Sequence, residues 1–239
     1  MPVTAGPIYP GIKDGLVFAI DPANKDSWAG PTSDNVNNLV SYNFTTGSIF
    51  NDPSGSYGVN ESFIFDGASD YIEFPYSDVN SYLNGVSQFT WSNWMKRNAS
   101  NSKMIIAKGT SVSNDISFEF WSDGNCYVEM GNGSNAYGSF SNNSTDWQLL
   151  TMVFDGTLTG NSNRLKAYLN GTQQSLSMGG TIGSTTHTNN GNLTIGKVEY
   201  QGGTFSHGEH GPFLIYNRAL SASEVTQNYN RLKGRFGLS

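Results

Sequence analysis

The sequence is poor in charged residues. Lys, Arg, Asp and Glu make up only 13% of its 239 residues, and the formal net charge is −6. No cluster of Lys or Arg is present, so the chain lacks the cations that displace counterions from a nucleic-acid backbone. No apolar run approaches the roughly 20 residues that span a bilayer. We therefore expect neither a nucleic-acid nor a membrane partner.

Cysteine is almost absent as well. Cys126 is the single cysteine, so no internal disulfide can form. It lies in the alternating run 126–130, which predicts a buried side chain acting as a small hydrophobe. The first residues have neither the basic segment nor the apolar segment of a secretory signal. We expect synthesis in a cytoplasm without export by that route.

Recognisable catalytic motifs are missing too. Glycoside hydrolysis needs two carboxylates about 5–10 Å apart, and the glutamates at 73, 119, 129 and 199 each stand alone in different segments. The sequence has no GxSxG, HExxH or P-loop motif. These absences predict that the protein is not an enzyme.

Aromatic and small polar residues are plentiful instead. The 5 Trp, 12 Tyr and 14 Phe supply enough apolar surface for a core. Short alternating segments separated by polar turns predict about a dozen strands in a sandwich or barrel. The strand at 88–96 carries aromatics on both faces, which predicts burial between two layers. The Pro- and Gly-rich residues 1–13 are expected to form an extended arm, and 14–239 a single domain.

Local signals place turns and one helix. Asp66-Gly67 predicts a tight turn between strands at 63–65 and 71–74, and Asn170-Gly171 predicts a hairpin between 165–169 and 175–178. Residues 21–60 are expected to be mostly loop. Ser221 and Glu224 form a capping box, which predicts a short C-terminal helix that ends at Gly234.

Five segments together resemble one family. They are similar, in order, to conserved strings of laminin-G-like, concanavalin-A-like jelly rolls: 65–73 (FDGASDYIE), 89–96 (FTWSNWMK), 147–156 (WQLLTMVFDG), 165–171 (LKAYLNG) and 215–224 (IYNRALSASE). The resemblance implies an all-β, two-sheet antiparallel jelly-roll sandwich with one short C-terminal helix. The tail at 227–237 also resembles the version of this domain in structural proteins of tailed bacteriophages.

The resemblance also directs attention to metal sites. Pentraxin-type relatives hold calcium with an Asp/Asn pair and acids from a later loop, which correspond here to Asn114, Asp115 and Glu199. Calcium prefers six to eight oxygen ligands, and the alternative is that Asn114-Asp115 simply forms a turn. His207, Glu209 and His210 offer a second hypothesis, a transition-metal site, and the alternative is that the two histidines are loop or contact residues.

Two functions compete at this stage. The first is a non-enzymatic virion structural protein, a capsid decoration or a head or tail fibre component, made in the host cytoplasm. Its N-terminal arm would contact other virion proteins, and copies would associate through exposed strands. The second is a lectin-like module for host surface glycans. Its sugar-stacking aromatics would be Tyr71, Trp121, Tyr137, Tyr200 and Phe205. An exported adhesion domain is disfavoured by the missing signal.

Overall fold

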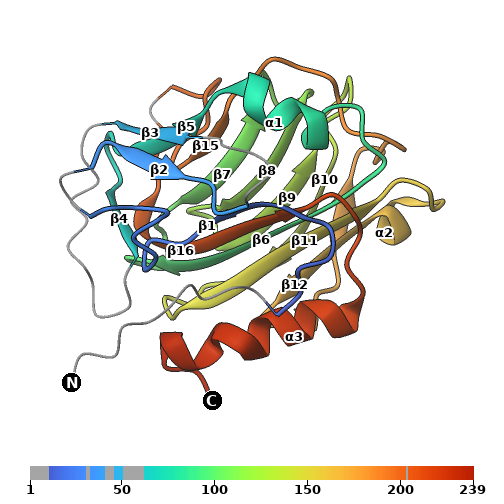
Figure 1. The fold of residues 1–239 in the computed structure, drawn as a ribbon. Coiled ribbons are helices and arrows are strands. Elements are labelled where there is room, and N and C mark those ends of the chain that lie inside the picture. The colour runs from blue at the N-terminus through green and yellow to red at the C-terminus, as the bar shows by residue number, and fades with distance from the viewer. Residues whose placement is uncertain (1–10, 31–32, 41–45, 51–61, 203) are drawn as a thin grey trace.

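The computed structural model describes residues 11–30, 33–40, 46–50, 62–202 and 204–239. Two antiparallel sheets form a sandwich, as the sequence predicts (Figure 1). The first is a seven-stranded sheet in the order β1-β16-β6-β11-β12-β13, in which β4 also pairs with β16. Its strands are β1 (Leu16–Ile20), β4 (Phe63–Asp66), β6 (Gln88–Arg97), β11 (Gln148–Asp155), β12 (Leu165–Leu169), β13 (Thr172–Gln173) and β16 (His207–Tyr216).

The second is a nine-stranded sheet in the order β14-β10-β9-β8-β7-β15-β5-β3-β2. Its strands are β2 (Asn35–Asn37), β3 (Thr46–Phe50), β5 (Tyr71–Phe74), β7 (Met104–Gly109), β8 (Asp115–Phe120), β9 (Asn125–Met130), β10 (Tyr137–Ser141), β14 (Ser177–Gly179) and β15 (Leu193–Ile195). The expectation that residues 21–60 are mostly loop is wrong in part, because β2 and β3 extend this sheet beyond β5.

The core lies between the two sheets and is rich in aromatic rings. Trp91 of β6 meets Phe118 of β8 edge-on, with ring centroids 5.7 Å apart. Phe18 of β1 meets Phe74 of β5 in the same way at 4.9 Å. Such edge-to-face contacts add stabilisation beyond that of burial alone. Cys126 is fully buried in this core, as its alternating run predicts.

The outer face of the seven-stranded sheet is also covered. Helix α3 (Ala222–Leu232) and the 3₁₀ turn η1 (Lys233–Phe236) run across it (Figure 1). Trp94 of β6 stacks on Phe236 at 4.2 Å and on Tyr229 at 5.8 Å. The predicted burial of β6 on both faces is therefore confirmed, with Trp91 facing the core and Trp94 facing α3.

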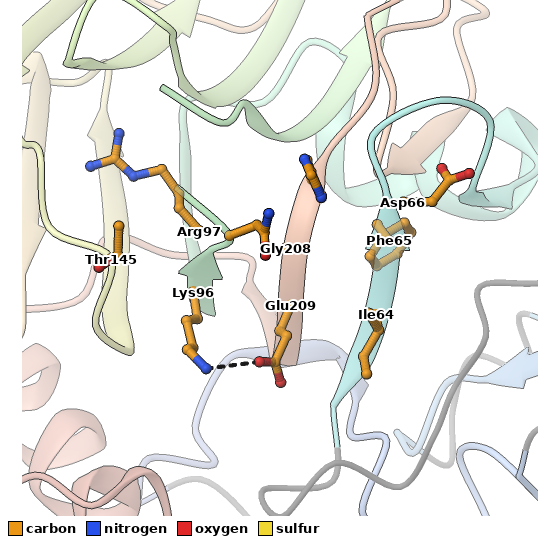
Figure 2. A pocket seen from close by; sticks show the side chains of 10 residues that line it. Ile64, Phe65, Asp66, Lys96, Arg97, Thr145, Gly208 and Glu209 are labelled. Carbon is orange, nitrogen blue, oxygen red and sulfur yellow. Dashed lines mark hydrogen bonds and ion pairs between the residues drawn. The ribbon is translucent and has the colours of Figure 1, made fainter. Parts of the chain in front are cut away.

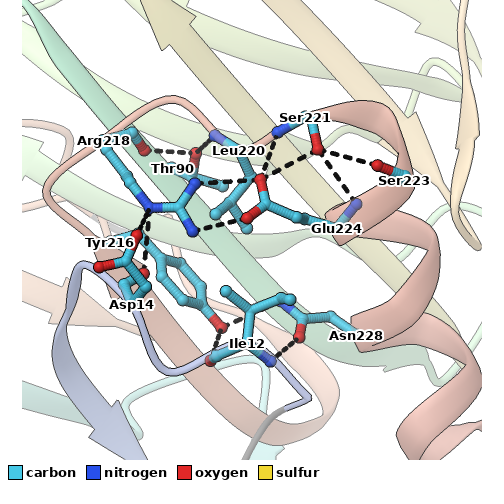
Figure 3. A network of polar contacts seen from close by, with 10 residues as sticks. All are labelled: Ile12, Asp14, Thr90, Tyr216, Arg218, Leu220, Ser221, Ser223, Glu224 and Asn228. Atoms are coloured by element: carbon cyan, nitrogen blue, oxygen red, sulfur yellow. Dashed lines mark hydrogen bonds and ion pairs between the residues drawn. The ribbon is translucent and has the colours of Figure 1, made fainter.

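A polar network fixes α3 to the sandwich (Figure 3). Ser221 and Glu224 form the predicted capping box. The Glu224 carboxylate also accepts two hydrogen bonds from Arg218, at 2.7 and 3.0 Å. This pairing lowers the pKa of Glu224 to about 2. Tyr216 and Asn228 hold the backbone of Ile12, so the chain preceding β1 lies along the helix. Of the predicted arm, residues 1–10 lie outside the described residues.

Both predicted turns form. Asp66-Gly67 connects the two predicted strands, but β4 lies in the seven-stranded sheet and β5 in the nine-stranded one, so the turn is a corner between sheets. Asn170 (φ 51°) and Gly171 (φ 79°) make the tight turn of a hairpin. Its second strand is β13 rather than 175–178, because Ser177–Gly179 crosses over to pair with β10.

The helices also differ in detail from the prediction. The α-helix ends at Leu232 and continues as η1, and the left-handed residue that follows η1 is Gly237 rather than Gly234. Two short helices were not predicted: α1 (Tyr76–Leu83), which buries Val79, Tyr82 and Leu83 in the core, and α2 (Asn161–Arg164). Within the described residues, no helix combines the length and the apolar character needed to cross a bilayer.

Candidate functional site

The outer face of the nine-stranded sheet carries the candidate site. We use this name for the side that faces away from the core. Along β8, Ile116, Phe118 and Phe120 point into the core, so the residues between them point outward. The loop between β15 and β16 crosses one part of this face, where Val198 packs on Ile105 and Ala107 of β7. Strands β8, β9 and β10 continue the face beyond that loop.

Four of the five predicted sugar-stacking aromatics share this face. Trp121 continues the outward positions of β8, and Tyr137 pairs with Glu129 across β9 and β10. Tyr71 is the first residue of β5, next to the core residue Ile72, and Tyr200 lies in the covering loop. Phe205 stands at the end of the same loop, where it bridges to Lys197. Residues far apart in the sequence thus gather on one side of the molecule.

The predicted aromatic side chains differ in the groups that their rings and hydroxyls contact. The ammonium of Lys197 lies 3.6 Å above the ring of Tyr71, and that of Lys103 lies 4.1 Å above the ring of Trp121. The Tyr200 hydroxyl donates to Asp115 Oδ2 at 2.6 Å. Tyr137 contacts Tyr127 edge-on at 5.6 Å. Tyr127 and Tyr137 thus form an aromatic pair, and Trp121 lies beside Tyr127 in the lining of one pocket.

A pocket of about 210 Å³ opens beside this group. It is smaller than the sites of drug-sized ligands, which run to about 300–1,000 Å³. Its walls combine two half-buried aromatic rings with carboxylates and amides. The lining residues are Val112, Glu119, Trp121, Asp123, Tyr127, Glu129, Asn135 and Gln201. This mixture of ring faces and hydrogen-bonding groups suits a polar ligand that has flat apolar patches.

Three acids meet at the base of the pocket, which corrects the expectation that the carboxylates stand alone. Asp115 and Glu119 both point outward from β8, and Glu129 lies on the neighbouring strand β9. One oxygen from each lies within 4.8 Å of the others. The Trp121 indole N–H donates to Glu119 Oε2, and Tyr200 holds Asp115. We call Asp115, Glu119 and Glu129 the acid cluster.

Burial dominates the electrostatics of the acid cluster. Asp115 and Glu119 are each 1% exposed. Loss of hydration raises the pKa of Asp115 to about 7 and that of Glu129 to about 9, and the charge of Glu119 adds to both effects. The pKa of Glu119 is also raised by burial. The cluster therefore retains protons at neutral pH that isolated acids would have lost.

The residues predicted to hold calcium are only partly brought together. Asp115 belongs to the acid cluster. Asn114 accepts a hydrogen bond from Gly133 N at 3.3 Å, and Glu199 accepts one from Asn192 N at 3.0 Å. Neither is a member of the acid cluster. A calcium site built from these three residues stays a prediction.

A second cavity, of about 350 Å³, lies where β4, β6 and β16 meet (Figure 2). Its charged groups already have partners. Lys96 pairs with Glu209 at 3.0 Å, and the Arg97 guanidinium donates to the carbonyl oxygens of Ser100, Asn142 and Ser144. These contacts indicate a structural role for both cations.

The two histidines of β16 do not form a metal site. His207 is exposed, whereas His210 is 1% exposed and lies against Phe65 in the interior. Both ring nitrogens of His210 are used, by Asn93 Oδ1 at 2.9 Å and Ser206 Oγ at 3.2 Å. Burial lowers the pKa of His210 to about 3. This histidine is a neutral core residue on a strand, which differs from the alternative interpretation as a loop or contact histidine.

Sequence reasoning missed Tyr127, Glu119 and Glu129 as members of a site. The signal was present in the alternation of 126–130, which buries Cys126, Val128 and Met130. The same alternation places Tyr127 and Glu129 on the outer face. The pairing of Ser117 with Glu129, however, depends on the register of β8 and β9, which no local pattern gives.

Comparisons with known proteins agree with this fold. The family model described as the concanavalin A-like lectin/glucanases superfamily (Laminin_G_3) matches residues 66–226. No curated protein sequence matches the chain. A similar solved structure is domain 4 of AbnA, an extracellular GH43 arabinanase from Geobacillus stearothermophilus, in complex with arabinotriose. It has a TM-score of 0.62 and 17% identity, over 91% of this chain and 100% of that one.

Two other similar structures come from larger chains. The binding domain of botulinum neurotoxin DC in complex with SialylT has a TM-score of 0.62 and 12% identity, over 92% of this chain and 52% of that one. The sialidase of Trypanosoma rangeli in complex with sialic acid has a TM-score of 0.61 and 11% identity, over 90% of this chain and 32% of that one. The chain thus spans about half of the neurotoxin domain and a third of the sialidase. At these identities the likeness concerns the fold.

Proposed function

The chain belongs to the concanavalin A-like lectin/glucanases superfamily, and from that premise we propose that it is a non-enzymatic glycan-binding domain whose ligand lies on the outer face of the nine-stranded sheet. The observation that carries the proposal is the grouping of Trp121, Tyr127 and Tyr137 beside a pocket lined with carboxylates and amides. Sugars offer apolar C–H faces and hydroxyls, which match rings and hydrogen-bonding groups respectively.

The similar structures support the same class of ligand. The arabinanase domain was solved with arabinotriose, the neurotoxin domain with SialylT and the sialidase with sialic acid. These ligands differ from one another, so the proposal concerns carbohydrate as a class. Two of the three proteins carry enzyme names. The burial of Asp115 and Glu119, each 1% exposed, favours a binding role over hydrolysis here.

A glycan array tests this function. The full chain is labelled and applied to arabinan-derived, sialylated and bacterial surface glycans, with CaCl₂ in one arm and EDTA in the other. Reproducible binding to a defined set of structures is expected in at least one arm. Absence of binding in both arms would refute the proposal.

The proposal also concerns the particle on which the domain is displayed. We infer that the domain is displayed on a bacteriophage particle as a capsid or fibre component, on the strength of the resemblance of residues 227–237 to virion proteins. The contacts of Ile12 and Asp14 with Asn228 and Arg218 hold residues 12–14 beside α3 and the turn before it, next to the predicted arm (Figure 3). Mass spectrometry of purified particles should find the chain in stoichiometric amounts, and its absence would contradict this setting.

A further inference from the structure

The acid cluster contains buried oxygen atoms that the protein itself does not satisfy. Among the described residues, Asp115 Oδ1, Ser117 Oγ and Glu119 Oε1 are buried without a hydrogen-bond partner. Buried polar atoms are nearly always paired, because losing water without a replacement partner costs about 1–3 kcal/mol per group. Three such atoms within five residues of one strand therefore call for an explanation.

These atoms converge on one place. Positions 115, 117 and 119 alternate along β8 with core residues, so all three side chains point to the outer face. Ser117 is 0% exposed and pairs directly with Glu129 on β9. Its hydroxyl lies toward Glu119 without the geometry of a hydrogen bond. The hydroxyl is thus a second kind of oxygen, independent of the carboxylates, aimed into the acid cluster.

The other oxygens of the two buried acids are held from outside. Tyr200 donates to Asp115 Oδ2, and Trp121 donates to Glu119 Oε2. Each acid is therefore fixed by one oxygen, while its second oxygen faces the other members of the cluster. Donors that orient the ligands in this way are the usual second layer around a bound metal.

We propose that Asp115, Glu119 and Glu129, together with the hydroxyl of Ser117, bind a divalent cation. The donor set consists of oxygen only, which selects hard cations over zinc or copper. The ligand atoms lie within 4.8 Å of one another, so all of them can reach a calcium ion bound at about 2.3–2.6 Å. Magnesium, bound at about 2.0–2.1 Å, demands near-ideal octahedral geometry and usually keeps several waters instead of a cage of protein ligands. Calcium is therefore preferred.

Charge supports the same conclusion. Three carboxyl groups share the site, and Lys103 is the cation whose charge acts on Glu119. A single ammonium does not offset three acids, two of them buried, whereas a divalent ion would stabilise their ionised forms. Glu119 and Glu129 also line the pocket, so the open side of the ion would face it. Water or a ligand hydroxyl would complete the coordination there.

The site is tested without any glycan, so its failure and that of the proposed function are distinguishable. The full-length protein is treated with EDTA, dialysed and titrated with CaCl₂ and with MgCl₂ by isothermal calorimetry. One saturable calcium site is expected, with magnesium binding at least about tenfold weaker. Thermal unfolding followed in the same samples should shift upward with CaCl₂, because a ligand of the folded state stabilises it.

Matched variants locate the site. Glu129→Gln keeps the shape of the neutral acid and is expected to fold, yet should weaken calcium binding at least about tenfold, since a charged ligand is lost. Glu73→Gln is the control, because Glu73 lies on the same face but pairs with Lys197 outside the acid cluster. The proposal is overturned if the folded wild type binds no calcium at millimolar concentrations, or if Glu129→Gln binds it as well as Glu73→Gln does. Magnesium binding as tight as that of calcium would overturn the preference for calcium.

Discussion

The hydroxyl of Tyr200 donates a 2.6 Å hydrogen bond to Asp115 Oδ2, joining the loop between β15 and β16 to the outer face of the nine-stranded sheet. Asp115 is 1% exposed, so this donor replaces water that the carboxyl group has lost. The same contact places the acid cluster at the boundary between the covered and the open parts of the face.

Removing that hydroxyl should destabilise the protein. Tyr200→Phe leaves a buried carboxyl oxygen without its donor, and we expect the free energy of unfolding to fall by about 1–3 kcal/mol. Tyr76→Phe is the control, since Tyr76 is 41% exposed on α1. Urea denaturation measured in EDTA compares the two variants. Equal midpoints would mean that the loop contact contributes nothing.

Trp94 should be the main anchor of the C-terminal helix. It is 1% exposed and stacks between Phe236 and Tyr229. Trp94→Ala should cost about 3–5 kcal/mol of unfolding free energy through the cavity that it leaves, and Trp94→Phe should cost clearly less. Chemical denaturation of both variants provides the measurement. If Trp94→Ala unfolds at the wild-type midpoint, α3 does not depend on this contact.

The Arg218–Glu224 pair should matter mainly through the helix cap. Glu224→Ala removes both the return bond of the capping box and the pair with Arg218, so we expect a loss of about 1–2 kcal/mol. Glu224→Gln can still close the box and should lose less than half as much. Urea midpoints distinguish the two variants, and an equal loss for both would assign the effect to charge instead of capping.

His210 should make the protein sensitive to acid. Its pKa is about 3 in the folded state and about 6.5 when exposed, and the groups touching the ring (Asn93, Ser206 and Phe65) carry no charge. Between these values the unfolded state binds one more proton, so stability falls as the pH falls from about 6.5 toward 3.

The contribution of this single group approaches about 1.4 kcal/mol per pH unit well below pH 6.5. Between pH 6 and 4, the free energy of unfolding should therefore decrease less steeply with falling pH in His210→Gln than in the wild type. The two slopes should differ by about 1.4 kcal/mol per pH unit. Parallel dependences in the two proteins would show that the histidine does not carry the effect.

The parts of the fold that local patterns dictate were predictable from the sequence. The capping box at Ser221 and the two-faced burial of β6 follow from spacing alone. The five segments that resemble the jelly-roll family, taken in order, predicted the two-sheet sandwich. Which sheet a strand joins was not predictable, because the Asp66-Gly67 corner and a hairpin use the same turn residues. Helix α1 was missed because its sequence, YSDVNSYL, is polar and poor in strong helix formers.

Which side chains lie on the outer face was predictable from the sequence, but which of them contact one another was not. The alternation along β8 and β9 determines which side chains point outward, and four predicted aromatics share that face. The acid cluster arises from pairing Ser117 with Glu129 across strands. A one-residue change of register would separate these side chains, and the sequence contains no local signal that sets the register.

Calorimetric titration with the best glycan from the array tests the central claim most directly, by comparing wild type, Trp121→Ala and Tyr76→Ala. Trp121→Ala removes a stacking ring at the pocket and should weaken glycan binding at least about tenfold, which corresponds to about 1.4 kcal/mol or more. Tyr76→Ala, which removes an exposed ring outside the pocket lining, should bind like the wild type. Wild-type affinity in a folded Trp121→Ala protein would contradict a glycan site on the outer face of the nine-stranded sheet.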